Sequence, residues 1–97
     1  MTACYIIYSG TIDKYYTGIT QESVEFRISK HNRKEYGMKY TSMANDWVLY
    51  HFIECETFVQ AVHIEKHIKR MKSRKYLEDL KKFPEMNLKL VAKYSTT

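Results

Sequence analysis

The chain has no apolar run approaching the ~20 residues that a membrane-spanning helix needs. Its N-terminus also lacks the basic segment and apolar stretch of a secretory signal. The sequence therefore predicts a cytoplasmic protein without a membrane partner. The two cysteines, Cys4 and Cys55, have neither the Cys-x-x-Cys spacing nor the neighbouring histidine pairs that are typical of structural zinc sites. We expect both to be reduced, buried thiols.

Acidic residues are the scarcer charged class, with 11 Asp and Glu against 16 Lys and Arg and a formal net charge of +5. This excess favours a polyanionic partner, although many small basic proteins bind nothing anionic. The 44% of apolar and 28% of charged residues are ordinary for a folded domain. We find no internal repeat or linker, and 97 residues leave room for one hydrophobic core. Residues 1–97 are therefore predicted to form a single domain.

Short runs rich in isoleucine and tyrosine open the chain. One run covers residues 4–8 and the next covers residues 15–20, with turn-forming residues between them. Two such runs joined by a short glycine-containing connection predict an antiparallel hairpin. A third run, residues 47–55, is almost entirely apolar or aromatic. This composition predicts a central strand that is covered on both faces.

Helical patterns lie between and after these runs. Residues 21–33 predict a first helix, and residues 32–46 predict a basic, tyrosine-bearing loop. Thr57 and Gln60 form a capping-box pattern, which predicts that the clearest helix of the chain covers residues 58–72.

The C-terminal third predicts one further helix. Ser73 is suited to cap a helix over residues 74–82, which Pro84 would end. Residues 88–94 give no decisive pattern. The order β-β-α-β-α-α predicts a small α/β sandwich, in which a three-stranded antiparallel sheet is flanked by helices.

A carboxylate, Glu65, falls among the apolar positions of the helix predicted over residues 58–72. At 100° per residue, the apolar side chains of this helix share one broad arc, which contains Phe58, Ala61, Val62, Ile64, Ile68 and Met71. A carboxylate in such a place needs compensation. The simpler interpretation is an ion pair with Lys69 or Lys72. The functional one is a ligand for a hard divalent cation, and position alone does not decide between them.

Tyrosines and cations gather on two other elements. Alternation along strands allows Tyr5 and Tyr16 to share one face of the hairpin, where Gly18 would leave space for a helix or a ligand backbone. Arg27 and His31 are four residues apart, so they stack on one face of the first helix, beside its apolar stripe. Since tyrosines are frequent in strands, the alternative for either tyrosine is a purely structural role.

Taken together, these features resemble the GIY-YIG nuclease domain over about residues 3–80. The likeness is to the small stand-alone branch of the family, similar to the N-terminal nuclease domain of the excision-repair excinuclease. It rests on segments in the order of the family's motifs, namely Ala3-Cys4-Tyr5, Tyr16-Thr17-Gly18, Glu25-Phe26-Arg27, Lys30-His31-Asn32, Lys39-Tyr40-Thr41, Trp47-Val48-Leu49, Glu65-Lys66 and Lys72-Ser73-Arg74-Lys75. The chain departs from the family at the first motif, where it keeps only the tyrosine. Asn87 is only a loose match to the late asparagine of many members.

The resemblance implies hydrolysis of phosphodiester bonds in DNA with one divalent metal, Mg²⁺ or Mn²⁺. Glu65 would bind the metal, and Arg27 would hold the scissile phosphate. Tyr5 would orient or deprotonate the attacking water, while Tyr16 would place the phosphate or share that role. His31 would transfer a proton, since its reference pKa of about 6.5 suits the task. A phenol with a pKa near ~10 needs a nearby cation or metal to act as a base at neutral pH.

Further basic residues are expected to contact phosphates without reading sequence. They are Arg33, Lys34, Lys39, Lys66, Lys69, Arg70, Lys72, Arg74 and Lys75. We therefore expect weakly sequence-specific or structure-directed cleavage, unless a second copy or a larger repair complex adds specificity. Two alternatives remain at this point: a non-catalytic nucleic-acid-binding module of the same fold, and a domain whose basic face binds an acidic protein.

Overall fold

The computed structural model describes residues 1–34 and 40–95 and begins with the predicted hairpin. The hairpin consists of β1 (Ala3–Ser9) and β2 (Lys14–Thr20), which pair antiparallel with Tyr5 opposite Gly18. The turn between them contains Asp13, whose φ of 52° lies in the left-handed region that aspartate tolerates. The prediction of a hairpin is confirmed.

The third strand, β3 (Val48–Glu54), also joins the sheet antiparallel, but the prediction that it is central is wrong. The strand order is β2-β1-β3, so β1 is the central strand and β3 forms an edge. Val48 is 57% exposed and Phe52 39% exposed, whereas β1 is buried along almost its whole length. A continuous apolar run can therefore also be a partly exposed edge strand.

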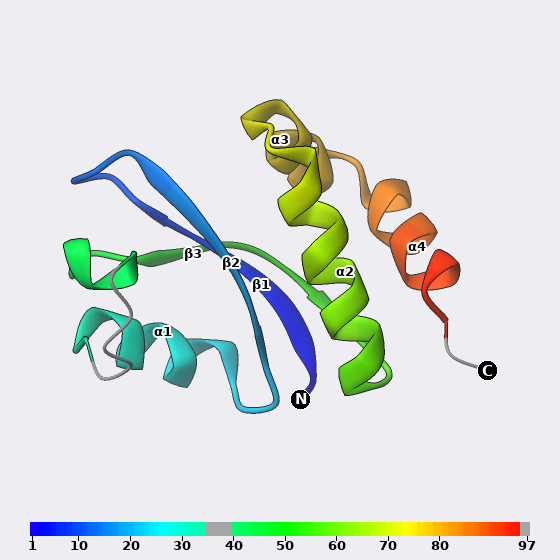
Figure 1. Cartoon of the computed structure of the whole chain (residues 1–97), viewed down its shortest axis with the longest axis horizontal. Coiled ribbons are helices and arrows are strands. Elements are labelled where there is room, and N and C mark those ends of the chain that lie inside the picture. Colours follow the sequence, from blue (N-terminus) through cyan, green and yellow to red (C-terminus); the bar gives the residue numbers. More distant parts are fainter. Residues whose placement is uncertain (35–39, 96–97) are drawn as a thin grey trace.

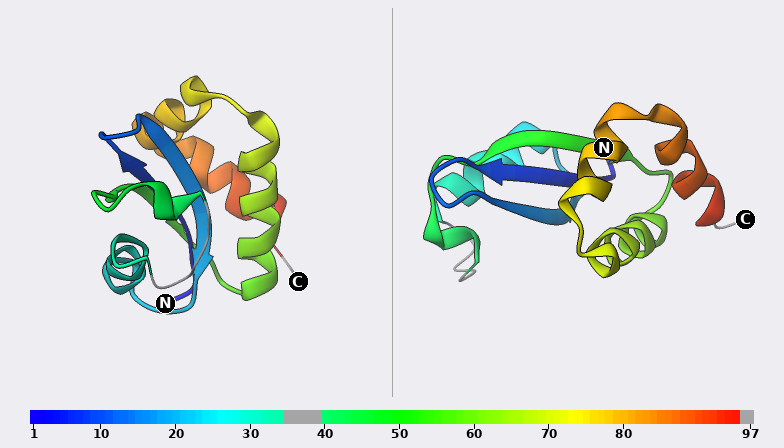
Figure 2. Two further views of the ribbon diagram at one scale, coloured as in Figure 1. Left: turned by 60° about the vertical axis from the view of Figure 1, so that its left-hand side comes forward. Right: turned by 90° about the horizontal axis from the view of Figure 1, so that it is seen from above.

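The helices cover the two faces of the sheet (Figure 1). One face carries α1 (Val24–Asn32), and α2 (Phe58–Met71) lies against β1 and β2 on the other. In the left view of Figure 2 the sheet separates these two helices. A short 3-10 helix, η1 (Thr41–Met43), lies within the segment that was predicted to be a loop. The small α/β sandwich predicted from the sequence is confirmed.

Side-chain caps fix where the helices begin. The hydroxyls of Ser23, Thr57 and Ser73 each accept a hydrogen bond from the backbone N–H three residues later. Ser73 thus opens α3 (Arg74–Lys82), as predicted. An additional helix, α4 (Pro84–Lys93), follows directly, so Pro84 ends α3 and starts α4.

Two hydrophobic cores lie on opposite faces of the sheet. The core between the sheet and α2, α3 and α4 is formed by Cys4, Ile6, Ile53, Cys55, Ala61, Ile64, Ile68, Leu80 and Leu90. The core on the α1 side is formed by Ala3, Tyr5, Ile7, Val24, Ala44 and Trp47. Cys4 and Cys55 are free and buried, as predicted. Within the described residues, no helix has both the length and the apolar character to cross a membrane.

Candidate active site

The phenol of Tyr5 lies inside the fold, beneath α1. Tyr5 is 1% exposed, and a side chain on the opposite residue Gly18 would place its Cβ 2.6 Å from the Tyr5 hydroxyl oxygen. Only glycine leaves room for the phenol there. The space beside Gly18 is therefore filled by Tyr5 itself, not left for a helix or a ligand backbone as the sequence had suggested.

His31 is the hydrogen-bond partner of Tyr5. It lies in the last turn of α1, is 1% exposed, and its Nε2 is 2.7 Å from the Tyr5 hydroxyl oxygen. Burial, reinforced by the nearby positive charge of Arg27, lowers the pKa of His31 from 6.5 to about 4. The imidazole is consequently neutral at pH 7, and a neutral ring can accept a hydrogen bond from the phenol O–H at one nitrogen.

Tyr16 lies beside the Tyr5–His31 pair on the side towards solvent, and the three residues form what we call the tyrosine cluster. Its ring centroid lies 6.5 Å from that of Tyr5 and 5.3 Å from that of His31, and the side chain is half-buried. The ammonium of Lys69 lies 5.5 Å from the centre of the Tyr16 ring, within the range of a cation–π contact. Tyr16, Tyr40 and Lys69 line an open cavity of about 370 Å³. Of the two predicted tyrosines, Tyr16 is thus the one that a substrate can reach.

Glu65 lies at the margin of the buried face of α2. That face is formed by Gln60, Ala61, Ile64 and Ile68, whereas Phe58 and Met71 at the helix ends are 47% and 45% exposed. The buried face is therefore rotated from the predicted arc, and the Glu65 side chain retains 18% exposure.

An ion pair joins Glu65 to the tyrosine cluster. Its Oε2 lies 3.5 Å from the Lys69 ammonium, so the simpler prediction for this carboxylate is realised in the structure. Because the same ammonium lies over Tyr16, Lys69 connects the carboxylate of α2 with the ring of β2. A pair with this geometry and half-exposed lysine is weak, and it leaves the carboxylate available to another cation.

The donor chemistry of Glu65 fits Mg²⁺ or Mn²⁺. Such ions often take one or two carboxylates from the protein and complete their shell with waters and substrate phosphate oxygens. Within residues 1–34 and 40–95, no group of three or more His, Cys, Asp and Glu side chains is arranged to hold a metal. A metal on Glu65 would therefore take most of its ligands from water and substrate.

Arg27 faces the sheet from the middle of α1. It is half-buried and lines a cavity of about 350 Å³, together with Thr20, Glu22 and Phe58. Its charge contributes to the lowered pKa of His31, which places it in the electrostatic environment of the Tyr5–His31 pair. The structure thus brings His31, Tyr5 and Tyr16 into contact on the α1 side of the sheet, with the charge of Arg27 acting on His31.

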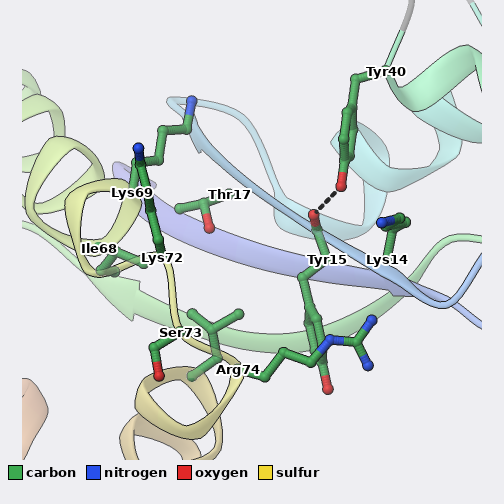
Figure 3. Close-up of a pocket in the computed structure, with 10 residues that line it drawn as sticks. Lys14, Tyr15, Thr17, Tyr40, Ile68, Lys69, Lys72, Ser73 and Arg74 are labelled. Carbon is green, nitrogen blue, oxygen red and sulfur yellow. Dashed lines mark hydrogen bonds between the residues drawn. The ribbon is translucent and has the colours of Figure 1, made fainter.

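A third cavity, of about 260 Å³, lies between β2 and the α2–α3 junction and is lined by cations (Figure 3). Its lining includes Lys14, Lys69, Lys72 and Arg74, and Tyr40 donates a hydrogen bond of 2.9 Å to the backbone oxygen of Tyr15 at its rim. Lys14, Tyr15 and Tyr40 were not among the predicted site residues. For Tyr40 the signal was the Lys39-Tyr40-Thr41 segment that resembles the family, whereas Lys14 and Tyr15 had only the general excess of basic residues and tyrosines.

The other predicted phosphate contacts are distributed over several surfaces. Arg74 pairs with Asp13 at 3.0 Å and Lys75 with Asp79 at 2.8 Å, while Arg33 donates to the Ser29 hydroxyl. Lys34 and Lys66 are exposed, and Arg70 reaches towards Tyr94 on α4. Lys39 lies outside the described residues. Within the described residues, Lys75, Arg33 and Arg70 thus contact partners outside the tyrosine cluster.

Asn87 lies on α4, and its side-chain amide forms hydrogen bonds that stabilise the fold. Its amide nitrogen donates to the backbone oxygens of Leu80 and Phe83, and its Oδ1 lies 2.7 Å from Nε2 of His51 on β3. Asn87 thus fastens the α3–α4 corner to the edge strand. These contacts account for the amide without a role in the tyrosine cluster.

Comparison with known proteins identifies one family. The model of the GIY-YIG catalytic domain matches residues 1–77, which include all three strands, α1 and α2. Neither the curated proteins nor the solved structures yield a match to the chain.

Proposed function

The chain belongs to the GIY-YIG catalytic domain family, whose members are nucleases, and we propose that it is a metal-dependent endonuclease that hydrolyses phosphodiester bonds in DNA. One set of contacts supports this proposal. Tyr5, Tyr16 and His31 come from three elements and contact one another, the charge of Arg27 acts on His31, and Lys69 links Tyr16 to Glu65. A domain that only binds nucleic acid has no need for this convergence.

The two tyrosines have different tasks in this proposal. Tyr5 is buried and hydrogen-bonded to a neutral His31, so it supports the neighbouring side chains of the site and does not contact the attacking water. Tyr16 borders the open cavity and would orient or deprotonate the attacking water. The Lys69 ammonium, 5.5 Å from the ring centre, would stabilise a phenolate at Tyr16. His31 then acts through Tyr5 and does not exchange protons with the substrate.

The charged residues stabilise the reacting phosphate. Arg27 would contact the scissile phosphate and offset the negative charge that builds up in the transition state. Glu65 would hold Mg²⁺ or Mn²⁺, an ion that supplies positive charge for the leaving oxygen in metal-assisted hydrolysis. Lys14, Lys72 and the other cations of the cavity in Figure 3 would hold the backbone next to the cleaved bond. Because they contact phosphates alone, we expect weak sequence specificity or recognition of DNA structure.

The direct test is incubation with plain, nicked and branched DNA in Mg²⁺ or Mn²⁺. We expect cleavage by the wild type and loss of cleavage in Glu65→Ala, with DNA binding retained. Asp79→Ala is the matched control, because it breaks the i,i+4 ion pair with Lys75 on α3 and should leave cleavage intact. Salt-sensitive binding without cleavage in any metal would instead establish a non-catalytic nucleic-acid-binding module.

The stability of Glu65→Ala shows whether Glu65 is a metal ligand or part of a structural ion pair. The Glu65–Lys69 pair is partly exposed, and such pairs contribute about 0–1 kcal/mol to stability. Glu65→Ala should therefore change the free energy of unfolding by no more than about 1 kcal/mol. A large loss of stability with normal cleavage would show that Glu65 serves the fold and not the chemistry.

A further inference from the structure

A groove of about 210 Å³ lies between α2 and α4, on the side of α2 that faces away from Tyr16 and β2. Its lining consists of His67, Tyr76, Met86, Lys89, Leu90 and Lys93. Burial of Leu90, and a hydrogen bond of 2.9 Å from the Gln60 amide to the backbone oxygen of Val91, hold α4 against α2. Figure 1 shows the two helices side by side.

The phenol of Tyr94 contacts two residues of this lining, His67 and Lys93, and is surrounded by cationic and imidazole groups. Its hydroxyl oxygen lies 2.8 Å from Nδ1 of His67 and accepts a hydrogen bond of 3.4 Å from the Arg70 guanidinium. The ring of His63 stacks on Tyr94 at 5.7 Å with 7° between the planes. The Lys93 ammonium lies 5.5 Å from the same ring.

The charged side chains that line the groove or reach Tyr94 are positive. Within the described part of the chain, no ion pair is formed by Lys89, Lys93 or Arg70. Burial together with the charges of Lys93 and Arg70 lowers the pKa of His67, which is what an electropositive environment does to a histidine. An uncompensated group of cations beside aromatic rings is suited to phosphate oxygens.

Helix geometry separates this groove from the tyrosine cluster. Side chains two positions apart on an α-helix point about 200° away from each other. Lys69 faces Tyr16, so His67 faces the other side, towards α4. Cations therefore flank α2 on both sides, and the two groups are separated by a helix about 10–12 Å across.

We propose that the α2–α4 groove binds a second stretch of nucleic-acid backbone, apart from the stretch that is cut beside Tyr16. This inference rests on the proposed nuclease function and extends its substrate contacts to α4, which lies beyond the residues that match the family. The second stretch is either the continuation of the same duplex across α2 or another arm of a branched substrate. Both present the same phosphate chemistry to Lys89 and Lys93.

The experiment measures the salt dependence of binding without metal, in excess chelator, for a linear duplex and a forked DNA of equal length. In the variant Lys89→Ala/Lys93→Ala, the slope of log affinity against log salt should become shallower by about 1.8, since each lost phosphate contact on duplex DNA accounts for about 0.9. A shallower slope on both substrates shows that the groove binds the continuation of the same duplex. A shallower slope on the fork alone shows that it binds a second arm. The control Lys81→Ala/Lys82→Ala removes two exposed lysines from the end of α3 and should leave both slopes unchanged.

Cleavage distinguishes failure of this inference from failure of the nuclease proposal. Cleavage by the wild type and by the Lys81→Ala/Lys82→Ala control in Mg²⁺ or Mn²⁺ tests the nuclease proposal separately, because Lys81 and Lys82 belong to neither site. An unchanged slope on both substrates overturns the inference even when cleavage is normal. Absence of cleavage in the wild type overturns the nuclease function, whereas a shallower slope in the variant would still locate a backbone contact in the groove.

Discussion

The hydroxyl oxygen of Tyr5 and Nε2 of His31 lie 2.7 Å apart, and both residues are 1% exposed. This hydrogen bond joins the central strand to the last turn of α1. Because His31 is buried beside Arg27, its pKa is about 4 and its ring is neutral at neutral pH. The pair is thus a fixed, uncharged contact, from which Tyr16 and Arg27 extend towards the surface.

The buried histidine predicts loss of stability in mild acid. Unfolded His31 has a pKa near 6.5 and folded His31 about 4, so the unfolded chain takes up the proton first as the pH falls. The free energy of unfolding should be highest above pH 6.5 and should fall by up to about 3 kcal/mol as the pH drops to 4. Denaturant titrations between pH 7.5 and 4.5 measure this decline.

His31→Gln is the variant that assigns this pH dependence. Glutamine keeps a polar group near Tyr5 but does not titrate, so the decline should become shallower even though the variant is less stable at pH 7.5. His67, whose pKa burial also lowers, contributes with the same sign, and His67→Gln measures its share. An identical pH dependence in wild type and His31→Gln would contradict the assignment.

Gly18 should tolerate no side chain. In Gly18→Ala the new Cβ would lie 2.6 Å from the Tyr5 hydroxyl oxygen and 2.7 Å from its Cζ, so the phenol must move away from His31. We expect a loss of about 1–3 kcal/mol, the usual cost of overpacking. Gly10→Ala is the control, because its nearest neighbour would be 3.9 Å away. Thermal and urea unfolding of both variants test this, and equal stability of the two would refute it.

The two tyrosines should respond differently to removal of the hydroxyl. Tyr16→Phe should retain the fold but lose most of the cleavage, together with any rise in rate between pH 7 and 9.5 at saturating metal. Tyr5→Phe should lose about 1–3 kcal/mol of stability, since His31 Nε2 loses its buried partner. It should nevertheless keep the pH-dependent rise. If Tyr5→Phe abolishes the rise and Tyr16→Phe does not, the roles are reversed.

Arg27 should act mainly in the transition state. Arg27→Ala should lower the single-turnover rate by about a hundredfold or more and change DNA affinity little. Lys66, which is exposed on α2, serves as the comparison, since Lys66→Ala should weaken only binding and its salt dependence. Normal cleavage by Arg27→Ala once DNA is saturating would show that another cation holds the reacting phosphate.

Local sequence determined most of the secondary structure. Alternation along the first two runs allowed Tyr5 and Tyr16 to share one face, which the register of the hairpin confirms, and the hydroxyls of Thr57 and Ser73 mark the starts of α2 and α3. The spacing of Arg27 and His31 likewise placed both on the inward side of α1. These features depend on residues a few positions apart, which is why the sequence alone carries them.

Tertiary structure decided what these residues can do. The apolar run of β3 suggested a central strand, but pairing between distant segments made β1 central, and no local pattern encodes that order. Burial of Leu90 in the core and the hydrogen bond from Gln60 to Val91 determined that the C-terminal segment docks as α4 beside α2. Burial, which is the sum of contacts from the whole chain, made His31 neutral and enclosed Tyr5, and left Tyr16 facing the cavity. A residue's type and spacing make it a candidate for catalysis, but solvent access and neighbouring charges arise only when distant segments meet.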